Sequence, residues 1–291
     1  MAPENINMRI IIAKIFKFLF ESEFLKKSRF FGIYKRIFKP LNLFKGVVCE
    51  IKYNQVQLIL HIEDWIQQNI YFLGEYETQE LKTLQQFLKE DGIFIDLGAN
   101  FGLYTLNASK LVGKKGTIIC FEPFSQNYKY LSNNIVINNL QNVQAENLAV
   151  GEKNGTINLY YDKQEKNLGM VSTKHIENSL KEEVQVVSID SYLQNKPLSH
   201  IDLIKIDIEG FEYSALMGMH ITLTKYKPTL LIEILKEEES DNNSKRIHDL
   251  LNKLGYRKYF IDDKGNLSEN ETNSKRFNYI FTTKPLAVNQ P

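Results

Sequence analysis

From residue 92 onward, short apolar runs alternate with segments whose apolar residues recur at helical spacing. Such runs are typical of strands that are buried on both faces of a parallel sheet. We expect five of these strands, at residues 93–97, 117–122, 143–149, 201–208 and 228–234. The order strand–helix–strand–helix predicts a doubly wound, mostly parallel α/β sheet with right-handed crossovers.

An insertion is expected between the third and fourth of these strands. It contains strands near residues 155–161 and 184–189, and the polar segment Asp162 to Glu183 that joins them carries His175. A connection of this length in a compact domain is usually a lid or disordered. His175 is a candidate base, although a histidine in a polar loop is more often only solvated.

Upstream of the α/β pattern, residues 47–53 and 56–62 predict a hairpin around Asn54-Gln55, and Glu77 to Leu88 predicts a helix. Trp65 and the stretch Tyr71 to Tyr76 lie between them. These aromatic side chains either form a wall of an acceptor pocket or belong to a core, and the second is the commoner role.

The pattern divides the chain into four predicted parts. A basic helical region is followed by a hairpin with a helix, an α/β domain that ends in an antiparallel hairpin at 256–262 and 277–283, and a tail. Their bounds are residues 1–45, 46–91, 92–285 and 286–291.

Charge distinguishes the first part from the others. Residues 1–45 contain ten Lys and Arg against three Glu, a net charge of +7 that leaves −6 for the rest. Ile12, Ile15, Phe16 and Leu19 fall on one helical face, but Lys14 and Lys17 make the run too charged to span a bilayer. We expect a helical subdomain that packs on the core or on a homodimer partner. The alternative is an amphipathic helix that lies on an anionic membrane.

Composition excludes some classes of protein. Cys49 and Cys120 are too few for a disulfide framework, which fits a cytoplasmic location. The net charge of the whole chain is +1, so overall electrostatics do not favour nucleic-acid binding.

The segment I-F-I-D-L-G-A-N-F-G-L-Y-T at 93–105 carries the first chemical signal. An apolar strand ends at Asp96, and Gly98 and Gly102 bracket the turn into a helix. Such glycines let the backbone approach a nucleotide-type ligand, and a helix start offers unpaired N–H groups. Asp96 would point its charge into that crevice. There it would oppose a pyrophosphate and attract the amino group or sulfonium of S-adenosylmethionine. The spacing also differs from the dinucleotide pattern G-x-G-x-x-G.

Polar residues also follow the next two expected strands. Glu122 comes 20 residues after Gly102, where a carboxylate accepts hydrogen bonds from ribose hydroxyls; a cap on the following helix is the alternative. Glu146 and Asn147, near the end of the third strand, are candidates for adenine contacts.

These motifs together resemble the FkbM family of S-adenosylmethionine-dependent methyltransferases over about residues 92–283. The resemblance rests on residues 96–105 together with F-E-P at 121–123, N-L-A-V-G-E-K-N-G at 147–155, V-V-S-I-D at 186–190 and I-D-L-I-K-I-D-I-E-G-F-E at 201–212. It implies the class I methyltransferase fold, with Lys205, Asp207 and Glu209 as the signature acidic stretch. It also implies S-adenosylmethionine as cofactor, with contacts from Asp96, Gly98, Asn100, Gly102 and Glu122.

The fourth strand is unusual because Lys205, Asp207 and Glu209 share one of its faces. Buried charges need partners, and a structural ion-pair network is one possible role. The other is catalysis, because the carboxyl ends of strands in open α/β sheets bind ligands. Asp207 or Glu209 would then take the proton of an acceptor hydroxyl. With Glu233 they would alternatively hold a divalent cation, which we favour less.

The leading hypothesis is an O-methyltransferase that acts on a hydroxyl of a glycan or small natural product. A nucleotide-dependent oxidoreductase is the second, and the missing third glycine and Asp96 weigh against it. A membrane adaptor that uses residues 1–45 and has a vestigial nucleotide fold is the third. The intact motifs around Asp96 and Asp207 argue against a nucleotide fold that has lost its function.

Overall fold

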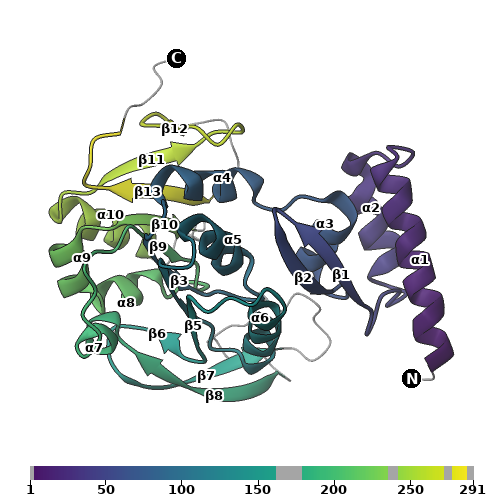
Figure 1. Ribbon diagram of the computed structural model, residues 1–291, viewed down its shortest axis with the longest axis horizontal. Coiled ribbons are helices and arrows are strands. Elements are labelled where there is room, and N and C mark those ends of the chain that lie inside the picture. Colours follow the sequence, from purple (N-terminus) through teal and green to yellow (C-terminus); the bar gives the residue numbers. More distant parts are fainter. Residues whose placement is uncertain (1–2, 162–178, 235–241, 272–276, 287–291) are drawn as a thin grey trace. The chain divides into compact units, whose positions relative to one another are not determined.

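A computed structural model describes residues 3–161, 179–234, 242–271 and 277–286. The chain divides into two compact units, one built on the residues up to Glu77 and one that begins at Thr78 (Figure 1). His175 and most of the polar segment predicted to be a lid or disordered lie outside the described residues, as does nearly all of the predicted tail. The four-part division remains a sequence interpretation.

The first unit combines helices with one hairpin. Its elements are α1 (Pro3–Glu21), η1 (Lys27–Arg29), α2 (Phe30–Ile33), the π-helical turn η2 (Tyr34–Phe38), β1 (Val48–Tyr53), β2 (Val56–His61) and α3 (Trp65–Leu73). The predicted hairpin is confirmed, because β1 and β2 pair antiparallel around Asn54 and Gln55. Both turn residues have positive φ, as a tight two-residue turn requires.

Aromatic side chains form the core of this unit. The Phe30 ring stacks on Trp65 with centroids 5.5 Å apart, and the Tyr34 ring lies 4.3 Å from Trp65. Phe72 is buried and contacts Phe38 at 5.5 Å. These contacts place the aromatic stretch in a core, the role that we favoured over a pocket wall.

The packed face of α1 differs from the predicted one. Ala13 and Phe20 are buried, whereas Ile15 is exposed. On the predicted face, Ile12, Phe16 and Leu19 are half-buried and Ile15 is exposed, so the packed face is rotated from the predicted one toward Ala13 and Phe20. Apolar residues occur on more than one side of this helix, so their spacing alone could not select the side that packs. No helix in the described part of the chain is long and apolar enough to cross a membrane.

The second unit contains an eight-stranded sheet and a separate three-stranded one (Figure 1). Its helices are α4 (Thr78–Phe87), α5 (Leu103–Val112), α6 (Ser125–Ile137), α7 (Ile189–Leu193), α8 (Glu212–Met217), α9 (His220–Tyr226) and α10 (Asn243–Lys253). The strands of the large sheet are, in spatial order, β12 (Leu267–Ser268), β11 (Arg257–Ile261), β13 (Asn278–Thr282), β10 (Thr229–Glu233), β9 (Leu203–Ile206), β3 (Ile93–Leu97), β4 (Thr117–Phe121) and β5 (Val143–Glu146).

The five strands from β10 to β5 are parallel, and β11, β12 and β13 pair antiparallel at one edge. The predicted doubly wound sheet with a C-terminal antiparallel hairpin is thus confirmed. The short β12 was not predicted, and β9 ends before Asp207.

The predicted third strand is two strands. Its second half, β6 (Ala149–Val150), leaves the large sheet and pairs with β8 (Leu180–Val187), which also pairs with β7 (Gly155–Tyr161). The chain changes sheets at Asn147, between the two halves. The insertion is therefore a small sheet of its own, and β8 begins four residues earlier than predicted.

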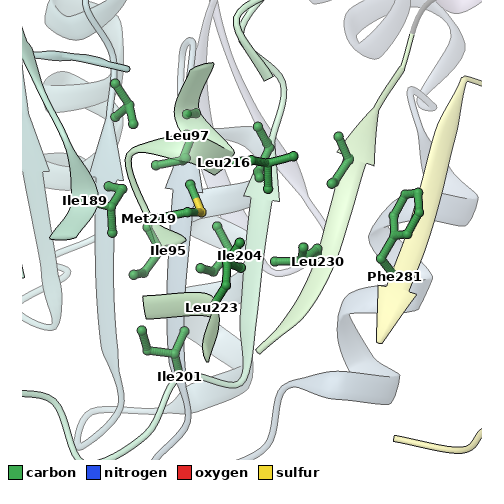
Figure 2. Close-up of a cluster of buried hydrophobic side chains, with 14 of the residues drawn as sticks. Ile95, Leu97, Ile189, Ile201, Ile204, Leu216, Met219, Leu223, Leu230 and Phe281 are labelled. Atoms are coloured by element: carbon green, nitrogen blue, oxygen red, sulfur yellow. The ribbon is translucent and has the colours of Figure 1, made fainter. Parts of the chain in front are cut away.

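One face of the large sheet packs against the helices that follow the insertion. Ile95, Leu97 and Ile204 point from β3 and β9 toward Leu216 and Met219, which lie in and just after α8 (Figure 2). Alternate residues of the same strands, such as Asp96 and Lys205, therefore point to the opposite face, where Asp96 meets Thr105 of α5.

Gly98 permits the close approach of the chain segments that follow β3 and β9. A Cβ atom built on Gly98 would lie 1.8 Å from the carbonyl oxygen of Asp207, and its φ is +83°. Both observations require glycine. Gly98 thus serves a contact within the protein, whereas the sequence suggested close approach to a ligand.

We predict that Gly98→Ala destabilises the protein by about 3 kcal/mol or more, because the new methyl group overlaps backbone in a conformation unfavourable to alanine. Gly255→Ala is the matched control. Gly255 has the same φ of +83°, and nothing lies within 4 Å of its Cβ position. The control substitution should lower the free energy of unfolding by about 1 kcal/mol. Urea unfolding of both variants measures the difference, and equal destabilisation would contradict the steric argument.

Candidate active site

The order of the strands defines where a ligand would bind. The chain runs outward from β3 to β4 and β5, then returns on the other side of β3 at β9. In open α/β sheets, ligands bind outside the carboxyl ends of the strands at such a reversal. The predicted cofactor and catalytic residues surround this point.

The loop from β3 to α5 is fixed by Glu122, which directly follows β4. The backbone N–H of Asn100 donates to Glu122 Oε2 at 2.8 Å, and that of Phe124 donates to Oε1 at 3.0 Å. Asn100 itself adopts a left-handed conformation, with φ of +52°. The structure therefore brings Asn100 and Glu122 together.

Glu122 is buried, and its burial raises the pKa of the carboxyl group to about 7, against the lowering effect of hydrogen bonds from Asn100, Phe124 and Asn127. A ribose contact and the loop contacts are compatible, because each carboxylate oxygen has a second lone pair. The two candidate roles from the sequence, ribose contact and local capping, would therefore use different lone pairs of the same two oxygens.

Gly102 packs between helices. A Cβ on Gly102 would lie 2.6 Å from Leu106 Cδ1 and 2.8 Å from Leu131 Cδ1, which belong to α5 and α6. With φ of +99°, it immediately precedes α5. The φ of this residue favours glycine, and a larger side chain would also displace the ends of the two leucine side chains.

Asp96 is fully buried on β3. Its Oδ2 accepts a hydrogen bond from Thr105 Oγ1 at 2.7 Å, while Oδ1 has no partner among the described residues. Burial raises the pKa of Asp96, and the charge of Lys205 opposes that shift. The expectation that Asp96 points its charge into the crevice is thus corrected: its carboxyl group is fully buried, on the face of β3 where Thr105 of α5 lies.

Asn147 joins the ends of two strands. Its amide group donates to the carbonyl oxygens of Glu122 and Pro123, both at 2.9 Å. The carboxylate of Glu146 accepts from Tyr192 Oη at 2.6 Å. Asn147 therefore holds the loop after β4, and its side-chain oxygen is the group left for the predicted cofactor contact.

Lys205, Asp207 and Glu233 form a cluster at the ends of β9 and β10. Lys205 is buried, and its Nζ donates to Asp207 Oδ2 at 2.8 Å and lies 4.5 Å from the centroid of the Tyr104 ring. Burial opposes the charge of Asp207. The charge of Lys205 and the hydrogen bonds from Glu233 and Lys205 outweigh that effect and lower the pKa of Asp207. Asp207 is therefore held ionised.

Glu209 lies at the exposed rim of this cluster. Its φ is +52°, a conformation that non-glycine residues seldom adopt and that is found at functional sites. The carboxylate of Glu212 supports the turn by accepting from the N–H groups of Ile208 at 3.3 Å and Gly210 at 3.0 Å. Burial of the Glu209 carboxyl group among neighbouring chain segments, and then the charges of Asp207 and Glu212, raise its pKa to about 7 against the opposing charge of Lys205.

Two of the carboxylates predicted as an alternative metal site, Asp207 and Glu233, contact each other. Lys205 Nζ and Glu233 contact Asp207, which leaves Asp207 paired with a cation and a carboxyl group. Among the described residues, no group of three or more His, Cys, Asp and Glu side chains is placed to hold a metal ion.

Several residues of the site were missed by the sequence interpretation. Tyr104 and Thr105 contact Lys205 and Asp96, and Glu212 supports Glu209. Two of the motifs contain them, in L-Y-T at 103–105 and G-F-E at 210–212. Their contacts could not be predicted because the sequence does not show that α5 covers the face of β3 and β9 that carries Asp96 and Lys205.

We predict that Glu122 makes stability depend on pH. A raised pKa means that the folded state binds the proton more tightly than the unfolded state. The stability from this group is therefore present below its ordinary pKa of 4.5 and lost as pH rises through about 7. Relative to Glu122→Gln, the wild type should lose on the order of 1–3 kcal/mol between pH 4.5 and about 8. Urea unfolding across this range tests it, and parallel profiles would contradict it.

Comparisons with known proteins give the family. A sequence profile of the "Methyltransferase FkbM domain" matches residues 96–258, more than half of the chain. No curated protein matches the chain. Among solved structures, the FkbM methyltransferase of Methylobacillus flagellatus KT is 16% identical with a TM-score of 0.43. The match covers 74% of this chain and 52% of that one. The present chain thus spans about half of the Methylobacillus protein.

Two other solved structures are similar at comparable scores. TYW2 of M. jannaschii, solved in complex with AdoMet, is 14% identical with a TM-score of 0.42, over 80% of this chain and 83% of that one. A SAM-dependent methyltransferase of Aquifex aeolicus is 17% identical with a TM-score of 0.39, over 74% and 96%. Because the profile matches most of the α/β unit, the chain belongs to the FkbM methyltransferase domain family.

Proposed function

We propose that this protein transfers a methyl group from S-adenosylmethionine to a hydroxyl group of a glycan or small natural product. One observation carries the proposal. A carboxyl side chain lies at or just after the carboxyl end of each of the five adjacent parallel strands. They are, in spatial order, Glu233, Asp207, Asp96, Glu122 and Glu146, and of these Asp96 is fully buried, so it would act on a ligand through its charge and not by direct exposure.

This acidic edge suits the proposed cofactor chemically. S-adenosylmethionine carries an ammonium and a sulfonium group and has ribose hydroxyls but no phosphate. Carboxylates attract the cations and accept hydrogen bonds from the hydroxyls, whereas they repel a pyrophosphate. Lys205, the buried cation of this edge, is already paired with Asp207. Within the edge, Glu122 would accept from the ribose, and the Asn100 loop that it holds would lie beside the cofactor.

When bound, the cofactor supplies a methyl group on a positively charged sulfur. The protein's task is to position the acceptor hydroxyl and remove its proton. Glu209 is the better base, because its carboxyl group lies at the rim and has a pKa near neutrality. Asp207 is held as an ion by Lys205 and Glu233, so it would orient the acceptor or the Glu209 turn.

The proposed class of acceptor is supported by this chemistry and by the resemblance to the family. A carboxylate base and neighbouring acidic groups suit an acceptor with several hydroxyls, since each hydroxyl donates to a carboxylate. The location predicted for such an enzyme is the cytoplasm.

Calorimetry with S-adenosylmethionine, its demethylated product and a nicotinamide dinucleotide tests cofactor choice. We expect both sulfur compounds to bind, and Glu122→Ala to weaken their binding by roughly 1.5–3 kcal/mol, the scale of a charged hydrogen bond. Gly255→Ala, remote from the acidic edge, is the control for general destabilisation. Tighter binding of the dinucleotide would refute the assignment.

Transfer of labelled methyl groups to a panel of glycans and polyhydroxylated natural products tests the base. Glu209→Gln should lower turnover by about 10²–10⁴ while cofactor binding and melting temperature stay unchanged. Because a base must be deprotonated, wild-type turnover should fall as pH drops below about 7. Glu90→Gln is the control. Glu90 is exposed just before β3, at the amino ends of the parallel strands, and this variant should retain full activity.

Normal turnover by Glu209→Gln would remove Glu209 from the mechanism. Dialysis against a chelator separates a base from a metal site, and we expect it to leave turnover unchanged. Loss of turnover that magnesium restores would favour the cation alternative.

A further inference from the structure

Helix α1 has two apolar faces, and only one of them is covered. Ala13 and Phe20 are buried on the inner face, and Phe16 packs edge-on against Phe38 at 4.9 Å. The outer face carries a stripe of large exposed apolar side chains at intervals of three and four residues. Their exposed fractions are Met8 62%, Ile11 58%, Ile15 52% and Phe18 67%. This spacing places all four on one side of the helix.

Exposed apolar side chains are concentrated in this part of the molecule. Of the twelve large apolar side chains that are exposed among the described residues, nine belong to the first 48 residues. Apart from the α1 stripe, they are Phe24, Phe31, Ile37, Leu41 and Val48. Scattered exposed apolar residues are normal, but a continuous stripe marks a surface that another molecule covers.

Cations accompany these apolar side chains. Exposed lysines and arginines occur at Lys14, Lys26, Lys27, Arg29, Lys35, Arg36, Lys39 and Lys45. Lys27 pairs with Glu75, and Lys35 Nζ lies 4.5 Å from the centroid of the exposed Phe31 ring. With a net charge of +7 over residues 1–45, the segment complements an anionic surface.

We propose that the outer face of α1, with the cations of residues 14–45, binds the surface of an anionic membrane. The α1 stripe would enter the interface between headgroups and acyl chains while the lysines and arginines contact anionic headgroups. The inner face stays packed on its own unit, so binding requires no unfolding. The two roles that the sequence offered as alternatives, packed helix and membrane helix, are served by opposite faces of α1. The proposal does not depend on the methyltransferase activity.

Flotation of the full-length protein with vesicles tests the proposal. We expect binding to phosphatidylserine-containing vesicles, weaker binding to pure phosphatidylcholine, and release by salt, because exposed charges are screened within about 10 Å at 0.1 M. Replacing Ile11, Ile15 and Phe18 by Gln should weaken binding at least about tenfold. Replacing Lys14, Lys26 and Arg29 by Gln should weaken it about fivefold per charge.

Matched controls come from the second unit. Val136→Gln with Ile221→Gln removes apolar side chains that are 71% and 66% exposed, and replacing Lys110, Lys114 and Lys115 by Gln removes three exposed cations. Both control variants should bind vesicles like the wild type. Equal weakening by the controls, or no binding of the wild type to either vesicle, would overturn the proposal.

Two further measurements test whether the outer face of α1 is covered by another part of the chain or by a second copy of it. The α1 stripe variant should keep the wild-type melting temperature, since its side chains lie outside the core. A lower melting temperature than that of the controls would show that the chain itself covers the face. Sedimentation without vesicles should give the same mass for wild type and variant. A wild-type dimer that the variant loses would assign the face to a second copy. Either result overturns the membrane proposal.

Discussion

The pairing of β3 with β9 is the constraint on which the rest of the second unit depends. It joins the half of the sheet built before the insertion to the half built after it, and the loops that leave these two strands touch at Gly98 and Asp207. Because the Asp207 carbonyl oxygen occupies the space of a Gly98 side chain, the two loops lie in direct contact, in a position that glycine at residue 98 allows. That position brings the Asn100 loop, Asp207 and Glu209 to the same edge of the sheet.

Burial of Lys205 on β9 follows from the same arrangement. A buried ammonium group requires compensation, and Lys205 receives it from Asp207, from the charge of Asp96 and from the Tyr104 ring. Its partners come from β3, α5 and the end of β9, so the cation links the elements of the site. The same charge keeps Asp207 ionised, whereas the pKa of Glu209, two residues further along, lies near neutrality. Under the proposed function, structural ion pair and catalytic group, alternatives in the sequence, would describe different residues of one cluster.

The sequence predicted the strands of the large sheet well because buried parallel strands are short apolar runs bounded by turn residues, a pattern that surface helices and loops do not share. It also predicted that the candidate site residues lie near one another, because they follow those runs and the carboxyl ends of parallel strands share one edge of the sheet. It did not predict that Asp96 faces inward to Thr105, since strand periodicity gives the face of a residue but not what covers it. The division of residues 143–149 between two sheets was missed for a related reason. The change of sheet occurs at Asn147, whose side chain donates to carbonyl oxygens of residues 24 and 25 positions earlier in the chain, and a local pattern does not reveal such distant contacts. On α1, two apolar faces made the packed side undecidable from spacing.

The β3–β9 pairing also has a consequence for biosynthesis. The N–H of Ile93 donates to Asp202 Oδ2, a partner 109 residues later in the chain. At a synthesis rate of about 5–20 residues per second, β3 leaves the ribosome roughly 5–20 s before β9. During that interval β3, β4 and β5 can pair, but the side of β3 that will pair with β9 has no neighbouring strand. Unpaired strand edges of this kind associate with other chains, so the nascent protein is most vulnerable to aggregation just before its central pair of strands can close.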